Sequence, residues 1–219
     1  MPMDFKNFFA IAKNEIRETC IICQGFDLPL FSKTAKNGLF VKTAQMENAT
    51  IIALKNNFLA GDAVLHLKGS SCKNIILFGS CGGCGNVNIG DLLTIDKAYN
   101  FESFTDMLEK NKKPSFRSCI AFPDNGILTT NSACVSSLLL EKDYIGFFKQ
   151  NKISAIDMES SVIASAANEI GAQVSCLFYV SDLVEAPFGA VLKNSEKQRI
   201  SEARKKTAET IKRQVKSKM

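Results

Sequence analysis

The chain has 219 residues, of which 46% are hydrophobic, and this length and composition suit one α/β domain with a substantial core. No segment approaches the ~20 uninterrupted apolar residues of a membrane span, and eight cysteines fall well below the density of a disulfide scaffold. The formal net charge is +5. We therefore expect a single domain over residues 1–219, with reduced thiols and no membrane contact, and a cytoplasmic location because the first residues lack a signal cleavage pattern.

The first predicted element is an amphipathic helix over residues 5–17, whose apolar side chains share one face: Phe5, Phe8, Phe9, Ala12 and Ile16. Strands are predicted at residues 19–23 and 49–54, followed by a helix over residues 59–67. That helix contains His66, the only histidine of the chain. Since no second histidine can complete a metal site, we expect His66 to be neither a ligand nor catalytic, and acid–base chemistry falls to carboxylates.

An apolar strand over residues 75–78 is predicted to run into a glycine-rich turn at residues 79–85. Four glycines within these seven residues let a backbone turn tightly and approach a ligand closely. The turn could present N–H groups, together with the Ser80 hydroxyl, to an anion or a sugar hydroxyl. A new strand is expected over residues 92–98.

Other motifs compete for the same glycine-rich segment. A dinucleotide-binding fingerprint would open a helix at once, and a phosphate-binding P-loop needs a lysine after its last glycine; neither condition is met. Cys81 and Cys84 form a C-x-x-C pair and keep thiol redox chemistry as an alternative, although such pairs normally open a helix. Cys20 and Cys23 repeat the spacing, but their apolar surroundings favour buried structural thiols over a zinc site.

The middle of the chain gives weaker signals. Residues 101–118 are polar and charged without a clear period, so we interpret them as a loop or lid beside the site. Short strands are predicted at residues 118–122 and 126–130, and a helix at residues 136–149.

Residues 153–186 are predicted to form a strand, a helix and a second strand. The helix has apolar residues at helical spacing: Val162, Ile163, Ala166, Ala167 and Ile170. A right-handed crossover would return the second strand parallel to the first, with both carboxyl ends at one rim of the sheet. Asp157, Glu159 and Asp182 would then meet at that rim, where α/β enzymes keep their chemistry.

The three acids are expected to differ in use. Asp157 suits the capping of the following helix. Glu159 lies in the first helical turn, where the macrodipole keeps a carboxylate ionised. Asp182 follows a strongly apolar strand, which should raise its pKa and keep it protonated. Two acids in opposite protonation states are typical of a catalytic pair.

The last predicted element is a basic helix within residues 193–219, which carry ten basic and three acidic side chains. Its charge of +7 exceeds that of the whole chain, so the basic surplus is local. An apolar stripe suited to docking runs along it: Ile200, Ala203, Ala208, Ile211 and Val215. Because aromatic residues are not interleaved with the charges, a solvated helix face is favoured over a nucleic-acid site.

The order and spacing of three motifs resemble the purine nucleoside phosphorylase and methylthioadenosine nucleosidase superfamily. These motifs are GSCGG followed by IGD at residues 79–83 and 89–91, AIDMES at residues 155–160, and VSD at residues 180–182. The resemblance implies a three-layer α/β domain with a central mixed sheet flanked by helices. It also implies cleavage of the N-glycosidic bond of a purine nucleoside, a small-molecule substrate, by a homo-oligomer without a metal or another cofactor.

The resemblance assigns a role to each matching residue. Met158 would pack under the ribose and Glu159 would accept hydrogen bonds from its hydroxyls. Asp182 would face the purine edge and protonate the departing base, which gains negative charge as the bond breaks. Ser80, with the early turn at Gly25, would hold inorganic phosphate as co-substrate or the attacking water.

Phosphate and water both remain open as acceptors. Phosphorolytic members place arginines around the phosphate, but here Leu77 and Phe78 directly precede Gly79 and residues 24–31 contain no arginine. The early turn at Gln24 and Gly25 and the GSCGG segment favour the phosphorylase branch instead. Asp27 is the only acid near the first turn that could activate water. The aromatic residue that stacks on the base has to come from elsewhere, with Phe101, Phe104 and Phe122 as candidates. A catalytically lapsed purine- or nucleoside-binding protein of the same fold is the second hypothesis.

Overall fold

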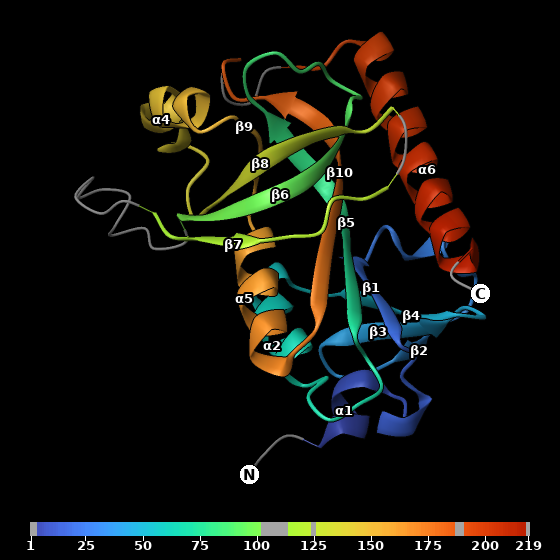
Figure 1. The fold of residues 1–219 in the computed structure, drawn as a ribbon. Coiled ribbons are helices and arrows are strands. Elements are labelled where there is room, and N and C mark those ends of the chain that lie inside the picture. Colours follow the sequence, from blue (N-terminus) through green and yellow to red (C-terminus); the bar gives the residue numbers. More distant parts are fainter. Residues whose placement is uncertain (1–3, 102–113, 124–125, 187–190, 218–219) are drawn as a thin grey trace.

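In the described part of the chain, ten strands form one twisted mixed sheet through the middle of the molecule (Figure 1). The computed structural model describes residues 4–101, 114–123, 126–186 and 191–217. The strands are β1 (Thr19–Gln24), β2 (Lys36–Asn37), β3 (Val41–Gln45), β4 (Ala49–Leu54), β5 (Asn74–Gly83), β6 (Leu92–Phe101), β7 (Phe116–Ser118), β8 (Leu128–Val135), β9 (Ile153–Asp157) and β10 (Gln173–Leu183). The α-helices are α1 (Phe5–Phe9), α2 (Ala60–Leu65), α4 (Ile145–Gln150), α5 (Ser160–Ile170) and α6 (Asn194–Ser217).

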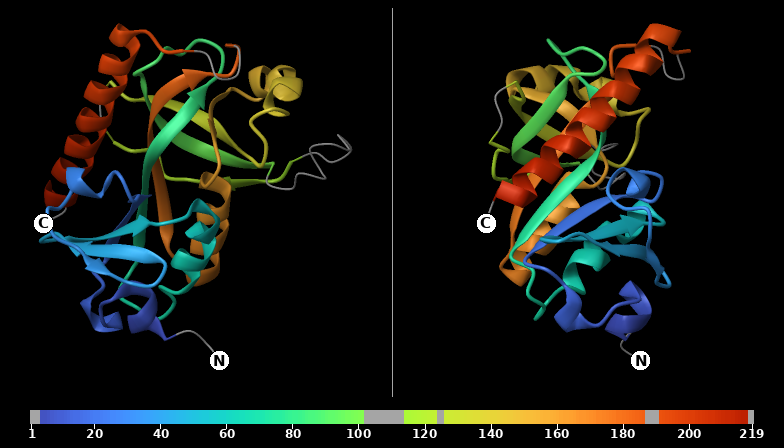
Figure 2. Two further views of the ribbon diagram at one scale, coloured as in Figure 1. Left: turned by 180° about the vertical axis from the view of Figure 1, so that it is seen from behind. Right: turned by 90° about the vertical axis from the view of Figure 1, so that its right-hand side faces the viewer.

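The sheet is arranged so that its central strands are covered on both faces. Its strand order is β10-β6-β8-β9-β5-β1-β4-β3-β2, with β7 paired to β6. Helices α2 and α5 lie together on one face, and the long helix α6 crosses the other (Figures 1 and 2). The expected three-layer α/β architecture with a central mixed sheet and flanking helices is confirmed.

Alternation along the central strands divides the core into two clusters. Ile22 of β1 and Leu77 of β5 point to the side of α2 and α5, whereas Ile21 and Ile76 point to the side of α6. Burial on both faces explains why these strands are continuous apolar runs rather than alternating ones. The predicted docking stripe of α6 is confirmed, since four of its five residues are buried: Ala203, Ala208, Ile211 and Val215.

The predicted strand–helix–strand unit exists, but its crossover was wrong. Strand β10 is not the parallel neighbour of β9, because β5 lies between them, parallel to β10 and antiparallel to β9. An additional pairing of β10 with β5 closes the strands β5, β10, β6, β8 and β9 into a ring. When a sheet closes into a ring, strands of opposite direction can become neighbours. A crossover in an open parallel sheet, which the sequence predicted, does not produce that arrangement.

The glycine-rich turn expected at residues 79–85 was also wrong, because residues 79–83 belong to strand β5. Gly83 opposes Ala155 of β9 while its other neighbour is β10, and a Cβ atom there would lie 2.8 Å from Val180 Cγ1. These glycines therefore allow strands to approach closely rather than to turn. The turn follows them, and its positive φ angles are those of Gly85 (78°) and Gly90 (90°).

The amphipathic helix predicted over residues 5–17 was wrong in extent. Helix α1 ends at Phe9, Ala10 adopts a φ of 60°, and a separate 3-10 helix, η1, spans Lys13–Glu15. The apolar side chains are nevertheless buried, including Phe8 and Phe9. A backbone hydrogen bond from Leu39 to the Asn7 carbonyl, 2.9 Å long, fixes α1 against the chain before β3. Tertiary contacts thus override the helical periodicity.

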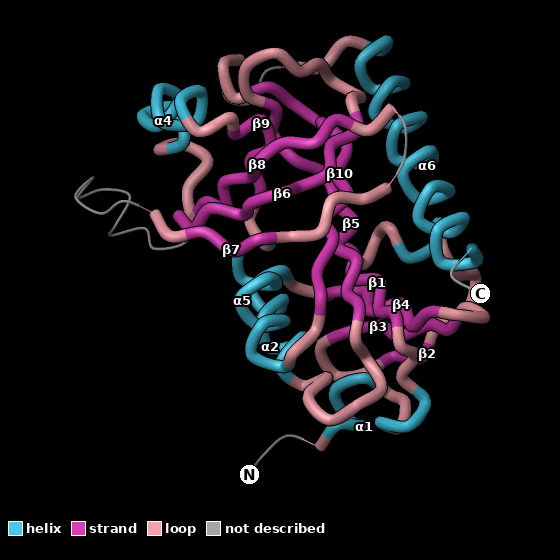
Figure 3. The backbone as a smooth tube through the Cα atoms, viewed as in Figure 1, coloured by secondary structure: helices cyan, strands magenta, loops and turns pink. Residues whose placement is uncertain are grey.

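The remaining predicted elements divide into confirmed and misplaced ones. Helix α6 and strands β1, β4 and β6 lie where the sequence predicts them (Figure 3). The helix predicted over residues 136–149 is replaced by a turn, the 3-10 helix η4 (Glu141–Tyr144) and α4, and residues 119–122 are not a strand. Residues 102–113 of the predicted lid, with Phe104, lie outside the described residues. None of the helices in the described ranges is long and apolar enough to cross a membrane.

Candidate functional site

A cavity of about 190 Å³ opens at the carboxyl ends of the parallel strands β1, β5 and β10. The turn between β9 and α5 and the 3-10 helix η4 complete its walls. Four of the predicted site residues line it: Ser80, Met158, Glu159 and Asp182. The ring closure explains their proximity, because β5 pairs with β9 at Gly82 and with β10 at the same residue.

Glu159 precedes helix α5 and is 8% exposed, with its Oε1 atom buried and without a hydrogen-bond partner among the described residues. Burial, followed by the charge of Asp157, raises the pKa of Glu159 to about 7. The expectation of a fully ionised Glu159 was therefore wrong, because desolvation outweighs the helix dipole. The unpartnered oxygen is an acceptor that a ligand could satisfy.

Asp157 has a structural use at the start of α5. Its Oδ2 atom accepts the Ser160 N–H at 2.7 Å, and its Oδ1 atom accepts the Ser160 hydroxyl at 2.7 Å. These bonds hold the first turn of the helix, so the predicted capping role of Asp157 is confirmed. The same geometry places its negative charge next to Glu159.

Asp182 lies near the end of β10 opposite Gly82, and its side chain is exposed to solvent. Its Oδ1 atom accepts the hydroxyl of Ser181 at 2.6 Å. The apolar setting expected around this carboxyl was wrong, because Asp182 is exposed and the residue that faces it on β5 is Gly82. A Cβ atom on Gly82 would lie 3.5 Å from Asp182 Oδ2, so the glycine keeps this carboxyl open to the cavity.

Glu141 is a cavity residue that the sequence did not reveal. It begins η4, is 7% exposed and lines the cavity with Asp182. Burial, followed by the charge of Asp182, raises the pKa of Glu141 to about 7. No sequence signal marked it, because the helix predicted over residues 136–149 would have exposed such a residue on a polar face.

The loop after β1 departs from expectation. Gln24 lines the cavity, but Gly25 does not. Asp27, the predicted activator of water, is fully buried and forms an ion pair with Arg204 of α6, in which Nε and Oδ1 are 2.5 Å apart. Arg204 also donates to the Phe26 carbonyl at 2.7 Å and lies over the Phe26 ring. Asp27 is thus held by α6 and does not line the cavity.

A second cavity adjoins the first. It has a volume of about 620 Å³, and its walls include Lys55, Phe58, Val135 and Val162. The two cavities share Asn57 and Met158, and Met158 is 40% exposed between them. Since binding pockets of small molecules usually span about 300–1,000 Å³, a ligand larger than a sugar would need part of both spaces.

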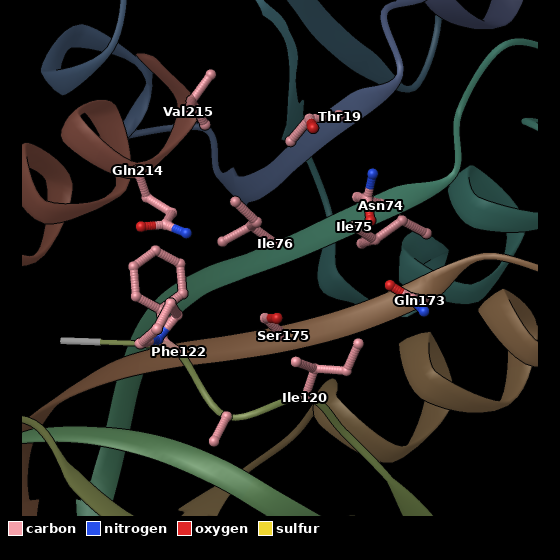
Figure 4. A pocket seen from close by; sticks show the side chains of 12 residues that line it. Thr19, Asn74, Ile75, Ile76, Ile120, Phe122, Gln173, Ser175, Gln214 and Val215 are labelled. Carbon is pink, nitrogen blue, oxygen red and sulfur yellow. The ribbon is translucent and has the colours of Figure 1, made fainter. Parts of the chain in front are cut away.

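A third cavity, of about 260 Å³, lies at the amino ends of the same three strands (Figure 4). Figure 4 shows Asn74, Gln173, Ser175 and Gln214 around it, and none of the described residues that line it is ionisable. Phe122 lies here and not in the first cavity, whose aromatic residues are Phe78 and Phe178. Neither Phe101 nor Phe122 therefore supplies the predicted base-stacking ring.

Neither Cys84 nor His66 has the surroundings of a catalytic group. None of the eight cysteines, all of which lie in the described ranges, forms a disulfide, and all are buried. Burial raises the pKa of Cys84 to about 11, whereas an activated redox thiol has a lowered pKa. His66 follows α2 and stacks on Phe8, with ring centroids 4.3 Å apart. Within the described ranges, no three His, Cys, Asp or Glu side chains are grouped so that they could hold a metal ion.

Comparisons with known proteins bear on this geometry. The family model described as Phosphorylase superfamily matches residues 123–216, which include β8, β9, α5 and β10. The expected resemblance to this superfamily is confirmed. The matched residues include Glu141, Met158, Glu159 and Asp182, whereas Ser80 and Asp27 lie before them. A search of the curated proteins finds no match to the sequence.

Several solved structures share the fold. Uridine phosphorylase from Vibrio fischeri ES114 has a TM-score of 0.69 at 15% identity, over 91% of both chains. Futalosine hydrolase from Helicobacter pylori, in a mutant form, has a TM-score of 0.66 at 14% identity, over 93% of this chain and 100% of the other. The Campylobacter jejuni 5'-methylthioadenosine/S-adenosyl homocysteine nucleosidase has a TM-score of 0.67 at 12% identity, over 93% and 100%. At such identities the likeness shows the fold.

Proposed function

We propose that the chain cleaves the N-glycosidic bond of a purine nucleoside. The observation that carries this proposal is that Glu159 and Asp182 reach one cavity from different strand ends, while Glu159 keeps a buried oxygen without a partner. An unsatisfied buried acceptor is costly unless a ligand donates to it. The vicinal hydroxyls of a ribose are donors of the required kind.

At the sugar end, Glu159 accepts the ribose hydroxyls and Met158 packs against the ring. Hydrogen bonds donated to a carboxylate favour its ionised form, so sugar binding lowers the pKa of Glu159 from its raised value of about 7 in the free protein. The carboxylate then stabilises the positive charge that develops on the ribose as the bond breaks.

At the base end, Asp182 protonates the leaving purine. Its exposure in the free protein suits a group that a flat base covers on binding, since loss of water around a carboxyl favours the protonated form. The proton then passes from the carboxyl to a ring nitrogen, and the electron pair of the broken bond stays with the base.

We propose water as the acceptor rather than inorganic phosphate. The cavity walls carry Asp157, Glu159, Glu141 and Asp182 but, among the described residues, no lysine or arginine. A phosphate dianion would meet uncompensated negative charge there. Ser80 is exposed at the cavity wall and orients the water, whose oxygen joins the sugar carbon; Gly25 flanks this region through its neighbour Gln24.

The structural neighbours are compatible with either acceptor, since their names include a phosphorylase, a hydrolase and a nucleosidase. The negative charges of this cavity, and not the neighbours, therefore favour water as the acceptor. Neither a metal nor an organic cofactor is part of the proposed reaction.

A purine- or nucleoside-binding protein without catalysis is the second candidate. The observation that favours it is the ion pair of Asp27 with Arg204, which holds the predicted water-activating carboxylate out of the cavity. In this case the sugar and base contacts serve binding alone.

We further propose that residues 1–219 act as one cytoplasmic domain that pairs with a second copy. Large apolar side chains are exposed around the first two cavities, including Phe58 (89%), Leu138 (44%) and Met158 (40%). Contact with a second copy would cover this surface and enclose the ligand. Light scattering of the wild type and Phe58→Ser tests the pairing, and two monomeric proteins would contradict it.

Base release decides between the functions. The protein is incubated with adenosine, inosine and methylthioadenosine, with and without phosphate, and free base is measured beside an Asp182→Asn control. Release without phosphate that Asp182→Asn abolishes supports hydrolysis, whereas release that requires phosphate overturns water as the acceptor. Tight binding without release supports the second candidate, and neither binding nor release overturns both.

A further inference from the structure

We propose that Glu141 is a second acid at the base end of the cavity and that, together with Asp182, it selects 6-aminopurine nucleosides over 6-oxopurine nucleosides. The inference rests on the proposed function and names its substrate class. It assigns a role to a buried acid that takes no part in the chemistry described so far.

The acids of the cavity separate into two ends. Glu159 interacts with Asn57 and with its neighbour Asp157. Glu141 interacts instead with Asp182, which reaches the cavity from β10. The sugar end is therefore formed by the β9–α5 turn and the segment before α2, and the other end by η4 and β10. A nucleoside that places its ribose at Glu159 directs its base toward Glu141 and Asp182.

Glu141 is available to a ligand although it is buried. It is 7% exposed and still lines the cavity, and no lysine or arginine forms an ion pair with it among the described residues. The charged and titratable groups that face it are Asp182 from β10, Lys142 from η4 itself and Cys84 from the turn after β5. The unpartnered Oε1 of Glu159, at the sugar end of the same cavity, indicates independently that the cavity takes a ligand.

Two neighbouring carboxyl groups that share one proton present one donor and one acceptor. The edge of a 6-aminopurine offers the complementary pair, a ring-nitrogen acceptor at N7 and an amino donor at C6, whereas a 6-oxopurine offers two acceptors. The protonated carboxyl donates to N7 and the ionised one accepts from the amino group. A 6-oxo group would instead face the carboxylate with its own lone pairs, so the pair discriminates against it.

The pair also fits the proton balance of hydrolysis. The shared proton moves to N7 as the bond between the base and the sugar breaks, and the bonding electrons remain on the base. Water supplies its oxygen and one hydrogen to the sugar carbon, and its second proton returns to the carboxyl pair. No other reactant is needed.

The test compares Glu141→Gln with the wild type on adenosine and inosine, with kcat/KM measured from base release. An amide can turn either its N–H₂ or its carbonyl toward the base, so the adenosine-to-inosine preference should fall by about tenfold or more, because one matched contact is worth ~1–3 kcal/mol of discrimination. Glu169→Gln, the same change on the exposed surface of α5, is the matched control and should keep the wild-type preference.

The pH profile provides a readout that a purely structural role would not change. Activity on adenosine should fall as the pH rises above about 7, where the pair loses its shared proton, and Glu141→Gln should shift that fall. An unchanged adenosine-to-inosine ratio in a folded Glu141→Gln protein overturns the inference and leaves the proposed function standing. If that variant does not fold, Glu141→Asp serves in its place, with the shortened acid expected to weaken the preference.

Binding separates this inference from the proposed function. If the wild type releases no base, calorimetry with adenine and hypoxanthine tests the same selection without catalysis. A preference for adenine that Glu141→Gln removes supports the acid pair in a binding protein, and equal affinity for the two bases overturns it.

Discussion

The three central parallel strands carry a cavity at each end, and the two cavities differ in chemistry rather than in size. The cavity at the carboxyl ends is about 190 Å³ and has four acids in its walls, whereas the cavity at the amino ends is about 260 Å³ and its polar wall residues are amides and hydroxyls among apolar side chains. At the carboxyl ends, the residues that follow each strand leave the ladder and are free to carry reactive side chains. The volume of a cavity alone therefore says little about its function. The side chains at the strand ends determine which chemistry the cavity can support.

The largest expected difference between the two ends is in activity. Asp182→Asn should lower kcat/KM for base release by about 10²–10⁴-fold, because an amide cannot donate the proton of a carboxylic acid to the base. Ser175→Ala, at the amino ends, is the counterpart and should leave kcat/KM within about twofold. An equal loss of kcat/KM in Ser175→Ala and Asp182→Asn would contradict the difference between the two ends.

The next effect concerns the ion pair behind the carboxyl-end cavity. Arg204→Met should lower the free energy of unfolding by about 3 kcal/mol, because it leaves the buried Asp27 carboxylate without a partner. Thermal melting measures the loss, and Lys206→Met, an exposed change on the same helix, should be nearly neutral. The double variant Asp27→Asn with Arg204→Met should regain much of the lost stability. Additive losses in the double variant would argue against a coupled pair.

A smaller, pH-dependent effect is expected for Glu159. Because folding raises its pKa from 4.5 to about 7, the wild type loses stability as the pH rises through that interval. Glu159→Gln should thus gain up to about 3 kcal/mol over the wild type between pH 5 and pH 8. Urea unfolding at both pH values measures this gain. Asn74→Ala, at the amino ends, is the control, and its free energy of unfolding should differ from that of the wild type by the same amount at each pH. If the difference between Glu159→Gln and the wild type is also the same at both pH values, the raised pKa of Glu159 is contradicted.

The smallest effect is expected for the thiols. Replacing Cys81 and Cys84 by alanine should leave base release within about twofold, since both are buried and burial raises their pKa values. Loss of activity in a variant that melts like the wild type would restore the thiol redox alternative.

The sequence predicted most of the elements and four residues that line the first cavity, because those signals are local. Continuous apolar runs identified β1, β4 and β5, and acids after a strand identified Glu159 and Asp182. Their meeting in one cavity depends on the closure of the ring through Gly82, which is a long-range event that no local pattern reports. Their roles in catalysis stay predictions.

The predictions that failed concern residues whose conformation or burial depends on elements distant in the sequence. The glycines of residues 79–83 looked like a turn because their use, close strand contact, is visible only with β9 and β10 in place. Glu141 was missed since its burial depends on the replacement of a predicted helix by η4. The expected charge state of Glu159 failed for the same reason, because desolvation is set by the surrounding elements and not by the residue's own place in the chain.

The bridge between Arg204 and Asp27 joins residues 177 positions apart in the chain. On a ribosome, the segment after the first strand would therefore emerge long before the guanidinium that neutralises it. Until then its carboxyl would remain hydrated, and the hydrophobic face beneath α6 would stay uncovered. Helix α6 must therefore leave the ribosome before this half of the protein can reach its folded state.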